Sequence, residues 1–318
     1  MVGIISTGIF MYGCTICSFR VKLGNKTFYK AGTKMKIAIV TDSTAYIPKQ
    51  IRDELNIYMI PLNVVFGTES YQEEAEISAD DFYVKVREQE ELPKTSQPAI
   101  GKFVELYEEL AKDYDAVISI HLSSGISGTY QTSTTAGQMV EGIDVYTYDS
   151  EISCEVQGFY VREGAKLASE GKNPKEIIAR FDEMKKTMDA YFVVDDLHHL
   201  QRGGRLNSAQ AFIGSLLQVK PVLYFRDKII IPFEKIRTRK KALKRIIEIF
   251  DEQASKGVPM EAVIIHAQRE EEANEWKKEL EAKYPHVTIR TGYFGAVIGT
   301  HLGEGALEIG RASCRERV

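Results

Sequence analysis

Apolar runs alternate with amphipathic stretches along the first half of the chain, and this alternation predicts strands and helices in turn. The runs are short and rich in Ile and Val, while Pro48 and Ser78 stand where helices commonly begin. Repeated strand, loop and helix units are typical of a mostly parallel sheet with helices on both faces. The expected strands are 36–42, 59–67, 115–122 and 144–150, and the expected helices are 48–57, 77–89, 101–114, 129–140 and 151–171.

The pattern changes from Asn173 onward, where hairpins and helices are mixed. The stretch KPVLYFRDKIIIPFEKIR (220–237) is expected to form a β-hairpin, and helices are expected over 174–188 and around Trp276. Such a mixture is typical of an α+β domain. We therefore predict an α/β domain over 35–160 and an α+β domain over 161–307.

Both ends of the chain differ from the body. Met35 begins MKIAIVTDST, which resembles the start of a first core strand, so residues 1–34 are expected to be a spurious leader. That leader lacks a basic region and is too polar and short for a membrane span. The last residues, EIGRASCRERV (308–318), resemble the translation of a sequencing adapter. We therefore expect the native chain to diverge after about Leu307, with its C-terminal strand missing.

Composition restricts the classes of function. The 318 residues are 44% hydrophobic and 27% charged, with a net charge of −4, which suits a cytoplasmic protein and does not call for nucleic acid or an anionic membrane as the main partner. Among four cysteines, Cys154 alone lies in the body and is interpreted as a buried small hydrophobe. The C-x-x-C of Cys14 and Cys17 has no further ligands nearby, so no metal site is expected.

Four polar clusters follow expected strands or lie close to their ends. Carboxyl ends of parallel strands meet at one edge of a sheet, so these hydroxyls are expected to line a common pocket for an oxygen-rich ligand. Taken one by one, each cluster is equally typical of an ordinary turn or helix cap. The clusters are TDST (41–44), KTSQP (94–98), HLSSGISGT (121–129) and YDS (148–150).

A serine nucleophile is the first alternative for the loop at 121–129. Ser124 and Ser127 lack the G-x-S-x-G context, and His121 lies on the strand side of both serines. Hydroxyls and backbone N–H groups without an activated base suit binding a carboxylate or phosphate better than attacking a carbonyl.

The second half adds basic candidates. Arg202 and Arg205 flank two glycines in LQRGGRLN, where they either pair with an anion or tie loops together. His301, in GTHLGEG, either donates to an anion or packs as a loop histidine. The basic stretch 235–245 is interpreted as a solvated helix face, with contact to anionic lipid or a partner protein as the alternative.

Taken together and in this order, TDST, KTSQP, HLSSGISGTYQ, YDS, LQRGGRL, KP and IGTHLGEGAL resemble the DegV family, and within it the fatty acid-binding subunits called FakB. The similarity spans nearly all of residues 35–307. It implies a two-domain protein that encloses a long-chain fatty acid, with the ligand between the α/β and α+β domains. The carboxyl group would be presented to a separate kinase, FakA, which makes acyl phosphate from ATP. It further implies a carrier without a catalytic residue or cofactor, with a role in phospholipid synthesis and a transient membrane or acyltransferase contact.

The resemblance also implies roles for single residues. Thr95 and Ser127 resemble direct carboxylate ligands, and His301 lies close by. Three positions depart from the family pattern, namely Tyr46, Ala99 and Glu304, and none of them is an expected ligand. The other expected ligand-binding positions are Ser96, Ser124 and Gly128, and the expected supporting or partner-facing positions are Arg202, Arg205, Asp42, Ser43 and Ser150.

Simple energetics agree with a lipid ligand. Burying about fourteen to sixteen methylenes at ~0.8 kcal/mol each contributes roughly ten kcal/mol before losses, so the hydroxyls mainly place the carboxylate. Two alternatives predict different behaviour. A hydrolase or phosphotransferase using Ser127 with His121 or His301 predicts turnover, and an interaction domain with a relic pocket predicts no bound lipid.

Overall fold

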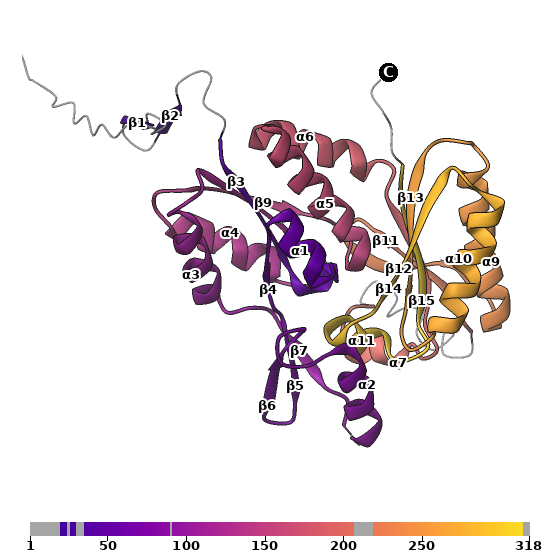
Figure 1. The fold of residues 1–318 in the computed structure, drawn as a ribbon. Helices are drawn as coiled ribbons and strands as arrows, with labels where there is room; N and C mark the ends of the chain where they lie inside the picture. The colour runs from indigo at the N-terminus through magenta and orange to yellow at the C-terminus, as the bar shows by residue number, and fades with distance from the viewer. Residues whose placement is uncertain (1–19, 24–25, 30–34, 90, 207–218, 314–318) are drawn as a thin grey trace, which may run out of the picture. The chain divides into compact units, whose positions relative to one another are not determined.

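A computed structural model of the chain describes residues 20–23, 26–29, 35–89, 91–206 and 219–313 (Figure 1). Near the N-terminus, β1 (Arg20–Leu23) and β2 (Lys26–Tyr29) pair as antiparallel strands. The C-x-x-C at residues 14–17 lies outside the described residues. The assignment of residues 1–34 as a leader stays a prediction.

A parallel sheet forms the first half of the body, with strand order β4-β3-β8-β9 and parallel pairing throughout. Every side chain of β3 and β8 is buried, because helices cover both faces of the sheet. The predicted α/β architecture is therefore confirmed. The strands are β3 (Ile37–Asp42), β4 (Ile57–Ile60), β8 (Ala116–His121) and β9 (Asp144–Asp149), and the helices are α1 (Lys49–Leu55), α3 (Ile100–Leu110), α4 (Thr129–Met139) and α5 (Cys154–Glu170).

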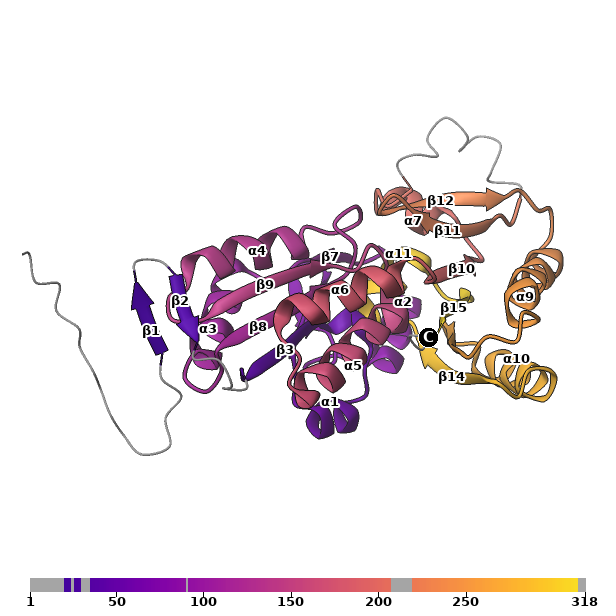
Figure 2. The ribbon, with the colours of Figure 1, turned by 90° about the horizontal axis from the view of Figure 1, so that it is seen from above.

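The two faces of this sheet have separate cores. On one face, Phe103 and Tyr107 of α3 pack with Val40 of β3 and Val117 of β8. On the other face lies α5, and Figure 2 shows α4 and α5 on opposite sides of β3, β8 and β9. The central strands are consequently buried along their whole length.

A small antiparallel sheet, absent from the sequence prediction, lies beside the parallel sheet with strand order β6-β5-β7. The single strand expected over 59–67 is wrong, since this run is divided between β4 of the parallel sheet and β5 of the small sheet. Helix α2 (Ala79–Glu88) follows, and Ser78 caps it as expected by accepting the backbone N–H of Asp81 at 3.1 Å. The new strands are β5 (Asn63–Phe66), β6 (Glu69–Gln72) and β7 (Lys94–Ser96).

A mixed sheet forms the second half, with strand order β12-β11-β10-β15-β13-β14. Only the β13 and β14 pair is parallel among these described strands, and β11 and β12 form the expected hairpin. Helices α9 (Arg239–Ala254) and α10 (Glu270–Lys283) bury one face of the sheet (Figure 1). The strands are β10 (Asp189–Val193), β11 (Val222–Arg226), β12 (Ile229–Glu234), β13 (Met260–His266), β14 (Val287–Tyr293) and β15 (Leu307–Ser313).

Strand β15 lies inside the mixed sheet between β10 and β13, where Ile309 pairs with Tyr191 on one side and Ile264 on the other. The expectation that the C-terminal strand is missing is therefore wrong. The adapter origin of residues 308–318 stays a prediction, and residues 314–318 lie outside the described part of the chain.

Helix α5 connects the halves. It packs against β3 and β8 of the parallel sheet and also against β13 and β15 of the mixed sheet. The predicted domain boundary at 160 and 161 falls inside this helix and stays a prediction. Three further helices complete the description, namely α6 (Pro174–Lys185), α7 (His198–Arg202) and α11 (Ala296–Leu302).

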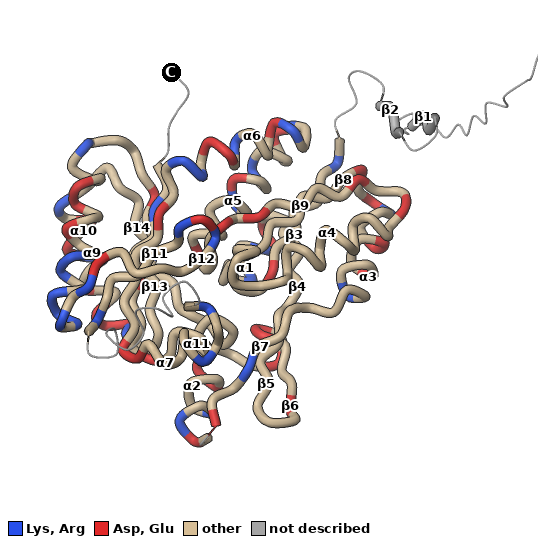
Figure 3. Tube along the Cα trace, turned by 180° about the vertical axis from the view of Figure 1, so that it is seen from behind, with Lys and Arg blue, Asp and Glu red and all other residues tan. Residues whose placement is uncertain are grey.

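The basic stretch 235–245 contributes the start of α9. Both α9 and α10 carry Lys and Arg as well as Asp and Glu (Figure 3), and Arg239 and Arg245 are both ion-paired to glutamates. This arrangement is that of a solvated, salt-bridged helix face, and membrane contact by the stretch stays a prediction. Within the described ranges, no helix combines the length and apolar character that crossing a bilayer requires.

Candidate ligand-binding pocket

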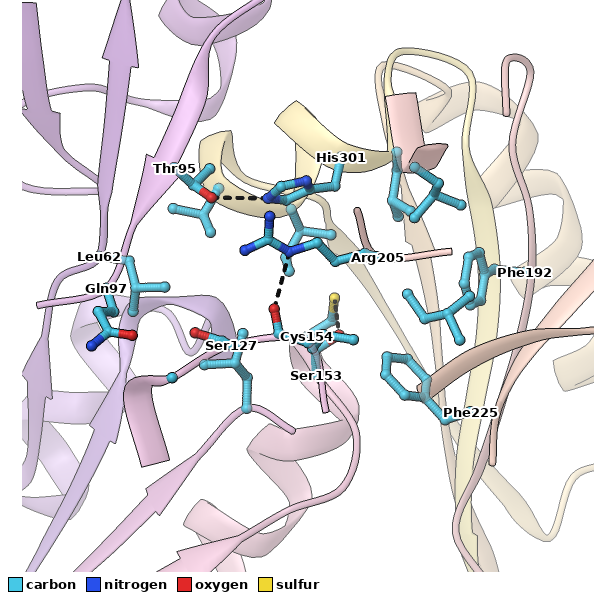
Figure 4. A pocket seen from close by; sticks show the side chains of 18 of the residues that line it. Leu62, Thr95, Gln97, Ser127, Ser153, Cys154, Phe192, Arg205, Phe225 and His301 are labelled. Atoms are coloured by element: carbon cyan, nitrogen blue, oxygen red, sulfur yellow. Dashed lines mark hydrogen bonds between the residues drawn. The ribbon is translucent and has the colours of Figure 1, made fainter. Parts of the chain in front are cut away.

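A cavity of about 270 Å³ lies between the parallel and small sheets on one side and the mixed sheet on the other. Its volume is just below the usual range for small-molecule sites, roughly 300–1,000 Å³. Figure 4 shows polar side chains at one end and aromatic rings at the other. Its wall includes Leu62, Thr95, Ser96, Gln97, Leu122, Ile126, Ser127, Gly128, Ser153, Cys154, Phe192, Leu200, Arg205, Phe225, Ile230, Val297, Ile298, His301, Leu302 and Glu308.

Thr95 and His301 meet at the polar end. Thr95 lies on β7 and His301 on α11, and the Thr95 Oγ1 atom is 2.9 Å from Nε2 of the imidazole (Figure 4). Burial, together with the nearby charges of Arg205 and His199, lowers the pKa of His301 to about 3, so the ring is neutral at pH 7. A neutral ring whose Nε2–H donates to Thr95 leaves the threonine hydroxyl free to donate to a ligand.

Ser127 is presented by the loop that follows β8. The loop is held by backbone hydrogen bonds from Ser123 N–H to the Ile152 carbonyl at 2.7 Å and from Ser127 N–H to the Ser123 carbonyl at 3.1 Å. The Ser127 hydroxyl lies 2.8 Å from that of Thr129. Gly128 permits a close approach, since a Cβ there would lie 2.1 Å from Oε1 of Gln97. The loop and β7 thus form one polar surface.

Arg205 supplies positive charge to the same end. Its Nε–H donates to the Ile126 carbonyl at 3.0 Å, and it also donates to the Gly203 carbonyl. Burial lowers the pKa of Arg205, yet a guanidinium stays charged at neutral pH. A second cavity of about 300 Å³ adjoins this end and shares Thr95, Arg205 and His301 with the first, and it is also lined by Leu92, Pro93, Lys94, His199, Arg202, Gly203 and Thr300.

The other end of the cavity is apolar. Phe192 of β10 and Phe225 of β11 face it from the mixed sheet (Figure 4), and Ile230 of β12, which pairs with Phe225, also lines it. Cys154, predicted to be a buried hydrophobe, is buried in this wall, and burial raises the pKa of its thiol well above the ordinary value. The exception is Glu308, whose buried Oε1 has no hydrogen-bond partner among the described residues.

Six predicted site residues come together in the cavity wall, as the convergence of the polar clusters implied. One step of that reasoning needs correction. KTSQP was expected to end a strand of the parallel sheet, whereas it forms β7 at the edge of the small sheet, paired with β5. The residues brought together are Thr95, Ser96, Ser127, Gly128, His301 and Arg205.

The remaining predicted residues lie elsewhere. Ser124 was expected to bind ligand, but its N–H and hydroxyl both donate to Asp149, at 3.1 and 2.5 Å, so it stabilises the loop instead. The hydroxyl of Ser150 donates to the Ile152 carbonyl at 3.0 Å. Arg202 is exposed and lines only the second cavity of the two.

Asp42 and Ser43 support the fold behind the cavity. The Oδ2 atom of Asp42 lies 3.0 Å from Nδ1 of His121 and accepts the Leu122 N–H at 3.0 Å. The Nε2 atom of His121 lies 2.8 Å from the Ser119 hydroxyl, and all three side chains are buried. Both ring nitrogens of His121 are therefore occupied, and this histidine cannot act as a base for Ser127. Ser43 donates to Glu73.

Sequence reasoning missed most of the apolar wall. Phe225 lies in the stretch that was correctly expected to form a hairpin, but an apolar pattern alone does not say whether a strand face meets a helix or a cavity. Gln97 had a usable signal, since it belongs to the KTSQP cluster and lies directly opposite Gly128. A sequence signal also existed for the residues of α11 that line the cavity, because they lie within one helix with His301. These residues are Val297, Ile298 and Leu302.

The parallel, small and mixed sheets enclose an amphipathic cavity, and they define the class of this protein as an α/β protein with a parallel sheet and a mixed second sheet. The chain belongs to the DegV family, since the family model described as "Uncharacterised protein, DegV family" matches residues 36–312. Protein DegV of Bacillus subtilis (strain 168) is 64% identical over 276 residues, which are 86% of this chain and 98% of the relative.

Solved structures give the same result. A crystal structure of DegV, described as a fatty acid binding protein from Bacillus subtilis, matches with a TM-score of 0.85 and 63% sequence identity, covering 88% of this chain and 99% of that one. A DegV family protein from Thermus thermophilus, described by its fatty acid binding, matches with a TM-score of 0.82 and 31% identity, covering 88% and 100%. The resemblance to the DegV family is confirmed, while the narrower FakB assignment stays a prediction.

Proposed function

We propose that this protein binds a long-chain fatty acid, with the carboxylate at the Thr95 end of the cavity and the alkyl chain against Phe192 and Phe225. The amphipathic lining of the cavity is the single observation that carries this proposal. The fatty acid binding described for the Bacillus subtilis and Thermus thermophilus relatives supports it.

The polar end suits an anionic head group. The hydroxyls of Thr95 and Ser127 can donate to carboxylate oxygens, and the guanidinium of Arg205 favours negative charge nearby. A buried carboxylate without donors would cost several kcal/mol, so these groups fix where the acid lies. His301, neutral and bonded to Thr95, orients that hydroxyl without adding charge.

The finer proposal is that the bound carboxylate is presented to a partner kinase. A carboxylate oxygen would attack the γ-phosphorus of ATP held by that kinase, forming the acyl phosphate as the bond to ADP breaks. The second cavity supports this step, because Lys94 and Arg202 line a space next to Thr95 and His301 where phosphate charge would be stabilised. The protein itself would act as a carrier.

Mass spectrometry of an organic extract tests the binding. Purified protein is expected to contain about one fatty acid per chain, and a lipid-free pocket after growth on fatty acids would contradict the proposal. Thr95→Ala and Ser127→Ala should lower acyl phosphate formation with the kinase, because each removes a donor. Thr135→Ala is the matched control, since this partly buried hydroxyl on α4 donates to the Gln131 carbonyl at 2.9 Å and belongs to neither of the two cavity walls described above.

A further inference from the structure

Helix α11 contributes a large part of the pocket wall. Val297, Ile298, His301 and Leu302 all line the cavity from this one helix. The position of α11 therefore sets both the polar contact between His301 and Thr95 and the width of the apolar part. Contacts that fix the first turn of α11 therefore also fix the part of the pocket wall that this helix forms.

The first turn of α11 is capped from a distant part of the sequence. Gly295 stands at the N-cap and has no side chain to accept the free N–H groups. Instead, the Val297 N–H donates to Oε1 of Glu73 at 2.8 Å, and the Ile298 N–H donates to the Tyr46 hydroxyl at 3.3 Å. Both acceptors belong to the half of the chain that carries the parallel sheet.

Glu73 is itself held firmly. Its Oε2 accepts the Ser43 hydroxyl at 2.5 Å, and its Oε1 accepts the Tyr46 hydroxyl at 3.0 Å. Ser43 in turn accepts the Leu62 N–H at 3.1 Å. The packing against α11 is close, since a Cβ on Gly295 would lie 2.3 Å from Cε1 of Tyr46 and 2.8 Å from Oε1 of Glu73.

A carboxylate suits this position chemically. The N-terminus of a helix favours negative charge, and three donors offset the cost of burying the group. Burial raises the pKa of Glu73 to about 7, while the hydrogen bonds from Ser43, Val297 and Tyr46 oppose the rise. Deprotonated or protonated, Oε1 keeps an acceptor lone pair for the Val297 N–H.

We propose that Glu73, with the Tyr46 hydroxyl, is a positioning residue that caps α11 from the opposite side of the pocket and thereby holds His301 and the apolar wall in place for the ligand. The inference rests on the proposed fatty acid binding and assigns a role to a residue that does not line the cavity. The loss of one helix cap changes the equilibrium constant for forming the helix about five- to tenfold.

The test uses the full chain loaded with palmitate labelled with ¹³C at the carboxyl carbon. Release into phosphatidylcholine vesicles gives a rate, and the ¹³C resonance reports the surroundings of the head group. Glu73→Ala should release palmitate about five- to tenfold faster and shift the resonance. Glu73→Gln keeps a carbonyl oxygen for Val297 and should restore both readouts nearly to wild type.

Glu155→Gln is the matched control. Glu155 is a buried glutamate that pairs with Arg162 and does not line the cavity, so its variant should release palmitate like the wild type. An unchanged rate and resonance in Glu73→Ala would overturn the inference, as would an equal change in Glu155→Gln.

If Glu73→Ala does not fold, Tyr46→Phe decides, because it removes only the hydroxyl that accepts from Ile298. Faster release and a shifted resonance in this variant support the inference, and wild-type values refute it. A wild-type protein that binds no palmitate refutes the proposed function itself. If the wild type binds palmitate, and Glu73→Ala has the release rate and the ¹³C resonance of the wild type, only the positioning role of Glu73 is refuted.

Discussion

Glu308 should make the stability of this protein fall as pH rises. The side chain is 2% exposed, lines the pocket, and has an Oε1 atom without a partner among the described residues. Burial raises the pKa of Glu308 from 4.5 to about 8. Between these values the folded chain keeps a proton that the unfolded chain releases, so the unfolded state is favoured as pH increases.

The expected size of this effect follows from the pKa change. Each pKa unit corresponds to about 1.4 kcal/mol, so the free energy of unfolding should fall by on the order of 5 kcal/mol between pH 4.5 and pH 8 on account of Glu308. The Glu308→Gln variant keeps the shape of the side chain and stays neutral at every pH. Its stability should match that of the wild type below pH 4.5 and exceed it by several kcal/mol at pH 8.5.

Urea denaturation of both proteins across this pH range measures the difference directly. Other titrating groups act equally in the two proteins, so the difference isolates position 308. If the difference in free energy of unfolding between Glu308→Gln and the wild type stays constant with pH, the reasoning is refuted. Such a result would mean that the Glu308 carboxyl group ionises as readily in the folded chain as in the unfolded one.

Three further predictions concern packing and charge around the pocket. Asp149→Asn should lower the free energy of unfolding by about 1.5–3 kcal/mol at pH 7. Asp149 accepts charge-assisted hydrogen bonds, and their combined effect lowers its pKa despite burial. Urea denaturation should show that the difference in stability vanishes as pH falls below that lowered pKa. Gly125→Ala places a Cβ 2.2 Å from the Lys228 carbonyl and should lower the melting temperature, whereas Gly101→Ala on α3, with nothing within 4 Å, should leave it equal or higher. Phe225→Trp should shift the fatty acids found by mass spectrometry toward shorter chains, and an unchanged profile would place the alkyl tail elsewhere.

The parallel sheet could be predicted from sequence because its strands are buried on both faces and read as continuous apolar runs. Ile37 to Val40 and Ala116 to Ile120 are such runs, and both are central strands. The small sheet could not be predicted, since the run at 59–67 has one apolar pattern but enters two sheets. That division depends on tertiary pairing with β6 and β7, which local pattern does not contain.

The sequence predicted those site residues that have a recognisable chemical group and lie near the end of an expected strand or in a known motif. Thr95 and Ser127 were found because hydroxyls follow apolar runs or lie in a recognisable motif. Ser124, three residues before Ser127, was assigned wrongly to the ligand because only the folded loop shows that it faces Asp149. Glu73 had no local signal, since its partner Val297 is 224 residues away in the chain.

The central claim is that one fatty acid lies in the cavity with its carboxylate at Thr95. A crystal structure of the protein purified with its own lipid tests it most directly. We expect a carboxylate oxygen within hydrogen-bond distance of the Thr95 and Ser127 hydroxyls, with alkyl density running past Phe192 and Phe225. A cavity filled only by water, or an acid bound in the reverse direction, would contradict the account.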